Sequence, residues 1–188
     1  MNSPWIKVLL SSLWVGAIAT CALPQASLAD DAASAVPATI VLPDGTECYW
    51  AGQGATLAFE GKRLNYTCGN TLGLIGDITI ANGTSITLET ATINGTTITG
   101  STSQTLNITS VMLTDGTTCT SAAADGLSRA IQDKPLDYFC NNSDTAAGLT
   151  GAITATNGVL SVDRITQEGF DRGYVETMTI STLTTAQP

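Results

Sequence analysis

Alternating hydrophobic and polar positions are the strongest pattern along the chain, and they are clearest between residues 76 and 113. The run from Ile78 to Ile80 precedes Asn82-Gly83, and the run from Ile86 to Leu88 follows it. Alternation with a period of two predicts strands that bury one face. Asn-Gly between two such runs predicts a tight hairpin, because both residues accept positive φ. We therefore expect an all-β fold.

The chain also repeats itself. The segment from Asp44 to Cys68 and the segment from Asp115 to Cys140 carry the same order of residue types at an offset of 71 to 72 positions. The hairpin pattern recurs around Asn157-Gly158. A self-match this long indicates a duplicated structural unit, with a first β repeat over residues 39–112 and a second over residues 113–188. The expected architecture is an internally duplicated antiparallel β-sandwich or small barrels.

The first 29 residues have the composition of a secretory signal peptide. A basic start precedes a mostly apolar run over residues 8–23, and Ser27-Leu28-Ala29 places small residues at the −3 and −1 positions. We expect an N-terminal signal helix within residues 1–29, cleavage after Ala29, and a flexible leader over residues 30–38. A lipoprotein attached through Cys21 is the minor alternative. The mature protein would be secreted or periplasmic, with no membrane span.

Four cysteines remain after cleavage, two in each repeat: Cys48, Cys68, Cys119 and Cys140. An even number of cysteines in an exported chain indicates disulfides. Within each repeat the two cysteines are 20 or 21 positions apart, whereas a four-thiolate zinc site usually uses close Cys-x-x-Cys pairs. Of the three possible connectivities we predict one bridge per copy, Cys48 with Cys68 and Cys119 with Cys140.

Charge and residue content narrow the possible functions. The full chain has a formal net charge of −9, and loss of Lys7 with the signal peptide leaves six basic against 16 acidic residues, a charge of −10. Such a protein repels phosphate backbones, so we expect no nucleic-acid partner. The chain contains no histidine, which removes Ser-His-Asp and Cys-His catalysis. It has no EF-hand spacing and no phosphate loop followed by a helix. We therefore expect no cofactor, no metal and no enzyme activity.

Tyr49 and Trp50 are the adjacent aromatic residues that could contact a ligand. A sugar-binding platform would use such rings, whereas the second repeat has Thr120 and Ser121 at the matching positions. Packing of Trp50 in the core is the favoured alternative, because aromatic rings contribute a large buried area.

The strands that carry the tyrosines, Tyr66-Thr67-Cys68 and Tyr138-Phe139-Cys140, are similar to a Tyr-x-Cys strand in the bacterial inhibitors of c-type lysozyme. The similarity covers these two tripeptides and does not assign the chain to that family. The sequence is best interpreted as an exported, non-enzymatic β-rich protein that binds a protein or glycan partner or belongs to the cell envelope. The alternatives are a secreted hydrolase with paired carboxylates and an acidic inhibitor of a basic secreted enzyme such as lysozyme.

Overall fold

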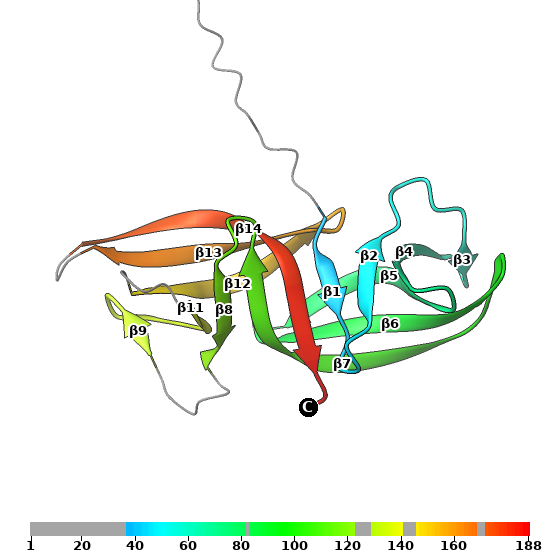
Figure 1. Ribbon diagram of the computed structural model, residues 1–188, viewed down its shortest axis with the longest axis horizontal. Helices are drawn as coiled ribbons and strands as arrows, with labels where there is room; N and C mark the ends of the chain where they lie inside the picture. Colours follow the sequence, from blue (N-terminus) through cyan, green and yellow to red (C-terminus); the bar gives the residue numbers. More distant parts are fainter. Residues whose placement is uncertain (1–36, 82, 123–128, 141–145, 169–171) are drawn as a thin grey trace, which may run out of the picture. The chain divides into compact units, whose positions relative to one another are not determined.

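Strands and tight turns make up the fold of the computed structural model, which describes residues 37–81, 83–122, 129–140, 146–168 and 172–188 (Figure 1). These ranges contain no α-helix, so the predicted all-β class is confirmed. The predicted signal helix and most of the predicted leader lie outside the described residues. In chain order the strands are β1 (Thr39–Val41), β2 (Glu47–Trp50), β3 (Ala58–Phe59), β4 (Lys62–Cys68), β5 (Leu72–Ala81), β6 (Ser85–Asn94), β7 (Thr97–Leu113), β8 (Thr118–Ser121), β9 (Ala130–Ile131), β10 (Lys134–Pro135), β11 (Tyr138–Cys140), β12 (Ala147–Thr156), β13 (Val159–Glu168) and β14 (Arg172–Ala186).

The alternation in the sequence corresponds to buried and exposed faces. On β4, Leu64, Tyr66 and Cys68 are buried while the residues between them are partly exposed. The Asn94-Gly95 turn joins β6 to β7, and the Asn157-Gly158 turn joins β12 to β13. Asn157 and Gly158 have φ values of 50° and 79°, as a type I′ hairpin turn requires.

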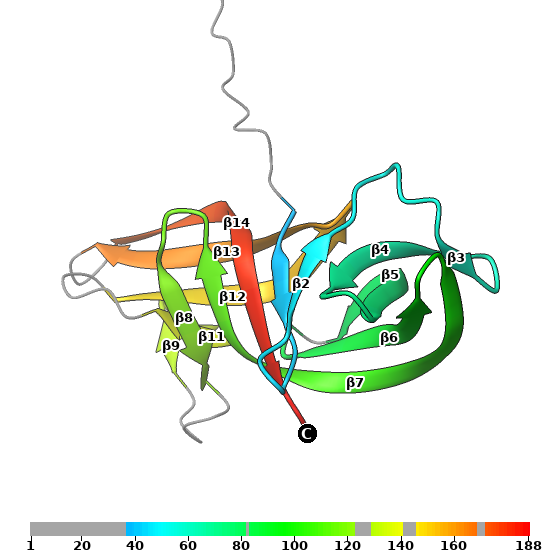
Figure 2. The same ribbon diagram turned by 45° about the vertical axis from the view of Figure 1, so that its right-hand side comes forward.

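The strand pairings close two rings that share β7 and β14. The first ring runs β2–β1–β14–β7–β6–β5–β4 and returns to β2. The second runs β7–β8–β11–β12–β13–β14 and returns to β7 through the β14–β7 pairing. Figures 1 and 2 show β14 leaving β13 and then passing beside β1. This last contact is a parallel pairing, with Thr39 opposite Thr182.

The two halves, residues 39–112 and 113–188, repeat each other's pairing registers. Tyr49 pairs with Thr67 as Thr120 pairs with Phe139. The β5–β6 ladder is interrupted between Ile75 and Thr79, and the β12–β13 ladder between Thr150 and Thr154. Where β7 and β14 meet, Val111 lies opposite Leu183. These two residues occupy matching positions in the halves, so the β7–β14 ladder is centred on a local twofold relation.

Each half contains one disulfide. Cys48 is bonded to Cys68, and Cys119 is bonded to Cys140, which confirms the predicted pairing. The bridges join β2 to β4 and β8 to β11, strands that also pair through their backbones. Two disulfides suggest an oxidising location, extracellular or periplasmic. Within the described ranges, no helix is long and apolar enough to span a membrane.

One hydrophobic cluster extends through both halves. It contains Ile40, Tyr66 and Leu106 of the first half together with Tyr138 and Leu183 of the second. Residues 33–188 accordingly form one compact unit. The disulfides are therefore local to each half, whereas the core and the two shared strands are common to both.

Two tyrosine hydroxyls connect the halves reciprocally. Tyr138 on β11 donates a hydrogen bond to the carbonyl of Gly83, in the β5–β6 turn, at 2.6 Å. Tyr66 on β4 donates to the carbonyl of Gly158, in the β12–β13 turn, at 3.3 Å. A buried hydroxyl without a partner is costly, so each tyrosine of the repeated Tyr-x-Cys strands fixes a hairpin of the opposite half.

Tyr138→Phe should lower the free energy of unfolding by about 1–2 kcal/mol, because it leaves the Gly83 carbonyl without its donor. Tyr66→Phe should cost less, since its hydrogen bond is longer. Tyr49→Phe is the matched control: its hydroxyl is exposed and should change stability by less than about 0.5 kcal/mol. Urea unfolding measures all three values. Equal values for the three variants would show that the cross-half hydrogen bonds do not stabilise the fold.

Candidate functional site

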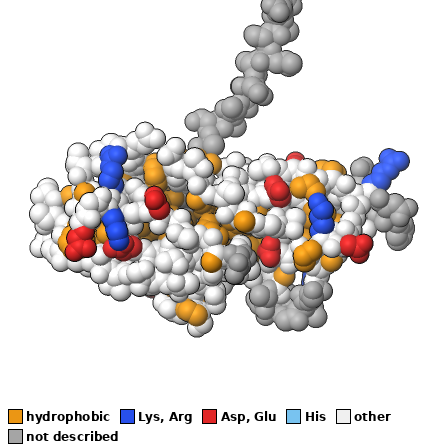
Figure 3. Space-filling model, turned by 180° about the vertical axis from the view of Figure 1, so that it is seen from behind, with side chains coloured by type: hydrophobic (Ala, Val, Ile, Leu, Met, Phe, Trp, Pro, Cys, Tyr) orange, Lys and Arg blue, Asp and Glu red, His pale blue; other side chains and the backbone are white. Residues whose placement is uncertain are grey.

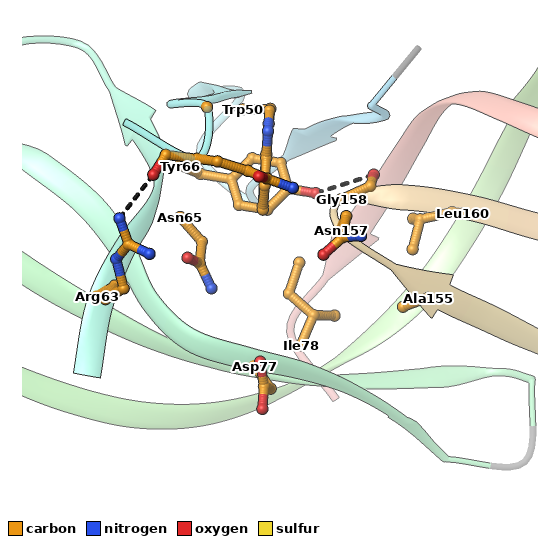
Figure 4. A pocket seen from close by; sticks show the side chains of 12 residues that line it. Trp50, Arg63, Asn65, Tyr66, Asp77, Ile78, Ala155, Asn157, Gly158 and Leu160 are labelled. Carbon is orange, nitrogen blue, oxygen red and sulfur yellow. Dashed lines mark hydrogen bonds between the residues drawn. The ribbon is translucent and has the colours of Figure 1, made fainter. Parts of the chain in front are cut away.

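A cavity of about 590 Å³ lies where the β12–β13 turn of the second half meets β2, β4 and β5 of the first (Figure 4). We call it the Trp50 cavity. Its walls come from three neighbouring segments within residues 50–78 and a fourth within residues 155–160, and half of the side chains in them are polar. The lining residues are Trp50, Gly52 and Gln53; Arg63, Asn65 and Tyr66; Asp77 and Ile78; and Ala155, Asn157, Gly158 and Leu160.

Trp50 is held in place by two neighbours. A Cβ added to Gly158 would lie 2.6 Å from the indole ring, so the absence of a side chain lets the turn approach Trp50 closely. On β4, the ring of Tyr66 meets the indole edge to face, with centroids 5.2 Å apart and planes at 77°. Trp50 is partly buried and packs against the core cluster while it lines the cavity. The Trp50 side chain thus contributes both to the core and to the cavity wall.

Tyr49 points to the other side of β2. Its side chain is 53% exposed, and its hydroxyl donates a hydrogen bond to Glu47 on the same face of the strand. It is not among the residues that line the Trp50 cavity. Of the two predicted ligand contacts, the structure therefore brings only Trp50 to this cavity.

Arg63 and Asn65 use their side chains to organise the polar wall. The Arg63 guanidinium donates to the carbonyl of Gln53 at 2.6 Å and to that of Ala55 at 3.2 Å, which fixes the loop between β2 and β3. The Asn65 amide donates to the carbonyl of Gly76 at 2.5 Å. This bond holds the interruption in the β5–β6 ladder. Asp77, the residue after Gly76, is exposed at the cavity wall.

A second cavity of about 410 Å³ shares Arg63, Asn65 and Asp77 with the first. Its wall also contains an ion pair between Lys62 and Glu89. The hydrogen bond from Lys62, together with one of 2.7 Å from Ser101, lowers the pKa of the Glu89 carboxyl. The two cavities are therefore neighbours that share a polar wall formed by β4 and β5.

At the matching positions, the second half has the same backbone pairings as the first but different side chains. Tyr138 and Gly83 reproduce the tyrosine-to-turn contact. By the offset of the pairing registers, Trp50, Arg63 and Asp77 correspond to Ser121, Pro135 and Ala152. The indole, the guanidinium and the exposed carboxylate are therefore absent at these three positions.

Asp137 stands where the first half has Asn65. It accepts a hydrogen bond of 3.1 Å from the backbone N–H of Gly151, whereas Asn65 donates to the carbonyl of Gly76. Burial raises the pKa of the Asp137 carboxyl, partly offset by that hydrogen bond. The two halves thus use the same strand position to hold the same interruption with opposite hydrogen-bond polarity.

Arg63, Asn65, Asp77 and Asn157 were not predicted as site residues. The signal that could have found the first three is the repeat itself, because the two copies differ in chemical type at these positions. Among the described residues, no group of three or more Cys, Asp or Glu side chains could hold a metal ion. Comparison of the chain with protein families, curated proteins and solved structures finds no match.

Gly158→Ala should displace Trp50. Alanine at a positive φ costs about 1–2 kcal/mol, and the overlap with the indole should add about 1–3 kcal/mol. Gly95→Ala is the matched control, because Gly95 also follows Asn in a hairpin turn and has a φ of 61° with nothing within 4 Å of an added Cβ. Urea unfolding and the tryptophan emission spectrum test this expectation. It fails if the two variants lose equal stability and keep the same emission.

Stability should fall in alkaline solution. Burial raises the pKa of Tyr66 to about 12 and also raises the pKa of Tyr138, while tyrosine in an unfolded chain titrates near about 10. The unfolded state therefore releases its protons first. The stabilising contribution of the neutral hydroxyls is complete below about pH 10 and is lost as the pH rises towards about 12. Melting temperatures of the native protein and of Tyr66→Phe/Tyr138→Phe, recorded against pH, should converge over this interval, and parallel curves would contradict the expectation.

Proposed function

We propose that this is an exported, non-enzymatic protein of the cell envelope or extracellular space that binds its ligand in the Trp50 cavity. The observation that carries the proposal is the composition of this cavity. It combines a fixed indole with amide, guanidinium and carboxylate groups, and ligand sites are typically concave and preformed, with placed polar groups that fix the orientation of the ligand. The disulfides and the sequence of residues 1–29 support the exported location.

The repeated registers support a duplication in which one copy became specialised. We propose that both copies retain the disulfide, the Tyr-x-Cys strand and the Asn-Gly hairpin because the scaffold requires them. The cavity-lining Trp50, Arg63 and Asp77 are present in one copy alone. Residues needed only for the fold should recur in both copies, so this difference favours a role in binding for the three side chains.

The hydrolase alternative has one supporting observation, since Asp77 and Glu89 line the second cavity together. Glycoside hydrolysis needs one carboxyl whose pKa is raised, so that it can act as a general acid. Lys62 and Ser101 instead lower the pKa of Glu89. Glu89 is therefore unsuited to the general-acid role.

The alternative of an acidic enzyme inhibitor is motivated by the net charge of −9. On the face shown in Figure 3, acidic and basic side chains are intermingled among uncharged ones. A surface of mixed sign gives weak electrostatic steering towards a basic enzyme, so a cavity-bound ligand is the better-supported proposal.

Trp50 provides a direct assay. The chain has three tryptophans, Trp5, Trp14 and Trp50, and only Trp50 lies in residues 30–188. In residues 30–188 the tryptophan fluorescence therefore comes from this one side chain in the cavity wall. Titration with separate pools of oligosaccharides, peptides and amines should give a saturable emission change with at least one pool.

The bound compound should be recovered unchanged when its mass is measured after overnight incubation, and cleavage would favour the hydrolase alternative. Tyr49→Phe should preserve the emission change, since that side chain lies outside the cavity. If no pool alters the emission of the folded protein, and native mass spectrometry detects no bound compound, the proposed function is wrong.

A further inference from the structure

We infer that the ligand of the Trp50 cavity is an uncharged oligosaccharide that contacts Trp50 with a sugar ring and the polar wall with its hydroxyls. This inference rests on the proposed binding function and adds the chemical class of the ligand. It follows from four features: the charges of the cavity, its hydrogen-bonding groups, the fixed position of Trp50 and the combined size of the two neighbouring cavities.

The charges of the cavity favour a neutral ligand. Arg63 donates from Nη2 to two backbone carbonyls of the loop between β2 and β3, and its positive charge is matched by the negative charge of Asp77 in the same wall. Asp77 leaves an exposed carboxylate at the wall. Together with the acidic net charge of the chain, this carboxylate disfavours phosphates, carboxylates and sulfates.

A cationic ligand is also disfavoured. Quaternary ammonium ligands are recognised by cages of several aromatic faces, and any cation needs an open ring face. Here Gly158 lies against the indole, and the ring of Tyr66, which is 1% exposed, meets Trp50 edge to face. The cavity therefore offers part of one aromatic ring and no aromatic cage.

The polar wall matches hydroxyl groups. Asn65 and Asn157 each carry an amide that can donate and accept, and Asp77 accepts through two oxygens. A sugar hydroxyl both donates and accepts, and neighbouring hydroxyls on one ring can bind a single carboxylate or amide through two hydrogen bonds. Figure 4 shows Asn65, Asp77 and Asn157 distributed around the cavity on the side away from the indole nitrogen of Trp50. Polar contacts can thus be made while a ring face packs on the exposed part of the indole.

The position of Trp50 is set before the ligand arrives. Contacts with Gly158 and Tyr66 restrict the rotamer of Trp50. A pre-ordered aromatic side chain loses little conformational entropy on binding. The C–H faces of sugar rings are apolar, so they are suited to a fixed, partly exposed indole with polar groups around it.

The combined size of the Trp50 cavity and the second cavity favours an oligomer over a single sugar. The Trp50 cavity of about 590 Å³ has the second cavity of about 410 Å³ as its neighbour, and Arg63, Asn65 and Asp77 line both. A chain of sugars could occupy both cavities, with its second part beside the Lys62–Glu89 pair. A monosaccharide would fill only a fraction of this volume and should bind more weakly.

The test uses residues 30–188 and four neutral hexasaccharides: cellohexaose, maltohexaose, xylohexaose and hexa-N-acetylchitohexaose. Calorimetry and Trp50 emission should show binding of at least one with a Kd of about 1 mM or lower, and at least about tenfold weaker binding of the matching monosaccharide. Trp50→Phe and Asp77→Asn, each checked for an unchanged disulfide map and cooperative unfolding, should weaken the calorimetric affinity at least about tenfold. Tyr49→Phe is the control outside the cavity and should bind like the native protein.

The outcomes separate this inference from the proposed function. If peptides or amines change the Trp50 emission and none of the hexasaccharides does, the saccharide inference is wrong and the binding function stands. If none of these probes binds, both are overturned. Saccharide binding that is equally strong in Trp50→Phe and Asp77→Asn would place the site elsewhere and would also overturn the inference.

Discussion

The fold depends on hydrogen bonds that each half donates to the other. A buried tyrosine hydroxyl must find an acceptor, and in this protein both acceptors are carbonyls of glycines in the opposite hairpin turn. The carbonyl of Gly158 also accepts the backbone N–H of Ala38 at 3.0 Å, so the turn secures the segment that leads into β1. The same turn lies against Trp50. The contact between Tyr66 and Gly158 therefore both joins the halves and shapes the cavity.

This arrangement explains why the functional side chains of the candidate site come from one half while its walls come from both. The first half contributes the indole and the charged groups, and the second contributes a turn whose position is fixed by Tyr66. In the opposite contact, Tyr138 fixes the β5–β6 turn, but Ser121 and Ala152 stand where Trp50 and Asp77 would be. A nearly symmetric scaffold thus carries chemistry that is not symmetric, and the binding proposal rests on this difference.

Local patterns predicted the local parts of the structure. Alternation located the strands, Asn-Gly located the hairpin at Asn157, and the repeat gave the disulfide pairing. The hairpin predicted at Asn82-Gly83 includes Asn82, which lies outside the described residues. That both rings share β7 and β14 could not be predicted, because residue alternation carries no information on which distant strand pairs with a given strand. For the same reason, the sequence singled out Trp50 but not the residues around it, which lie on β4, β5 and the β12–β13 turn. The predictions for residues 1–29 concern a part of the chain that the structure does not describe.

The parallel pairing of β1 with β14 has a consequence for the order in which the protein can fold. Synthesis delivers β1 first, yet one of its two neighbours in the first ring is the last strand of the second half. The first half can form its hairpins and its disulfide early, but its ring stays open until residues 182–184 are free to pair. Contacts between such distant segments form slowly, because a long loop must be ordered before they stabilise the chain. The native fold is therefore completed only once β14 is available to pair with β1.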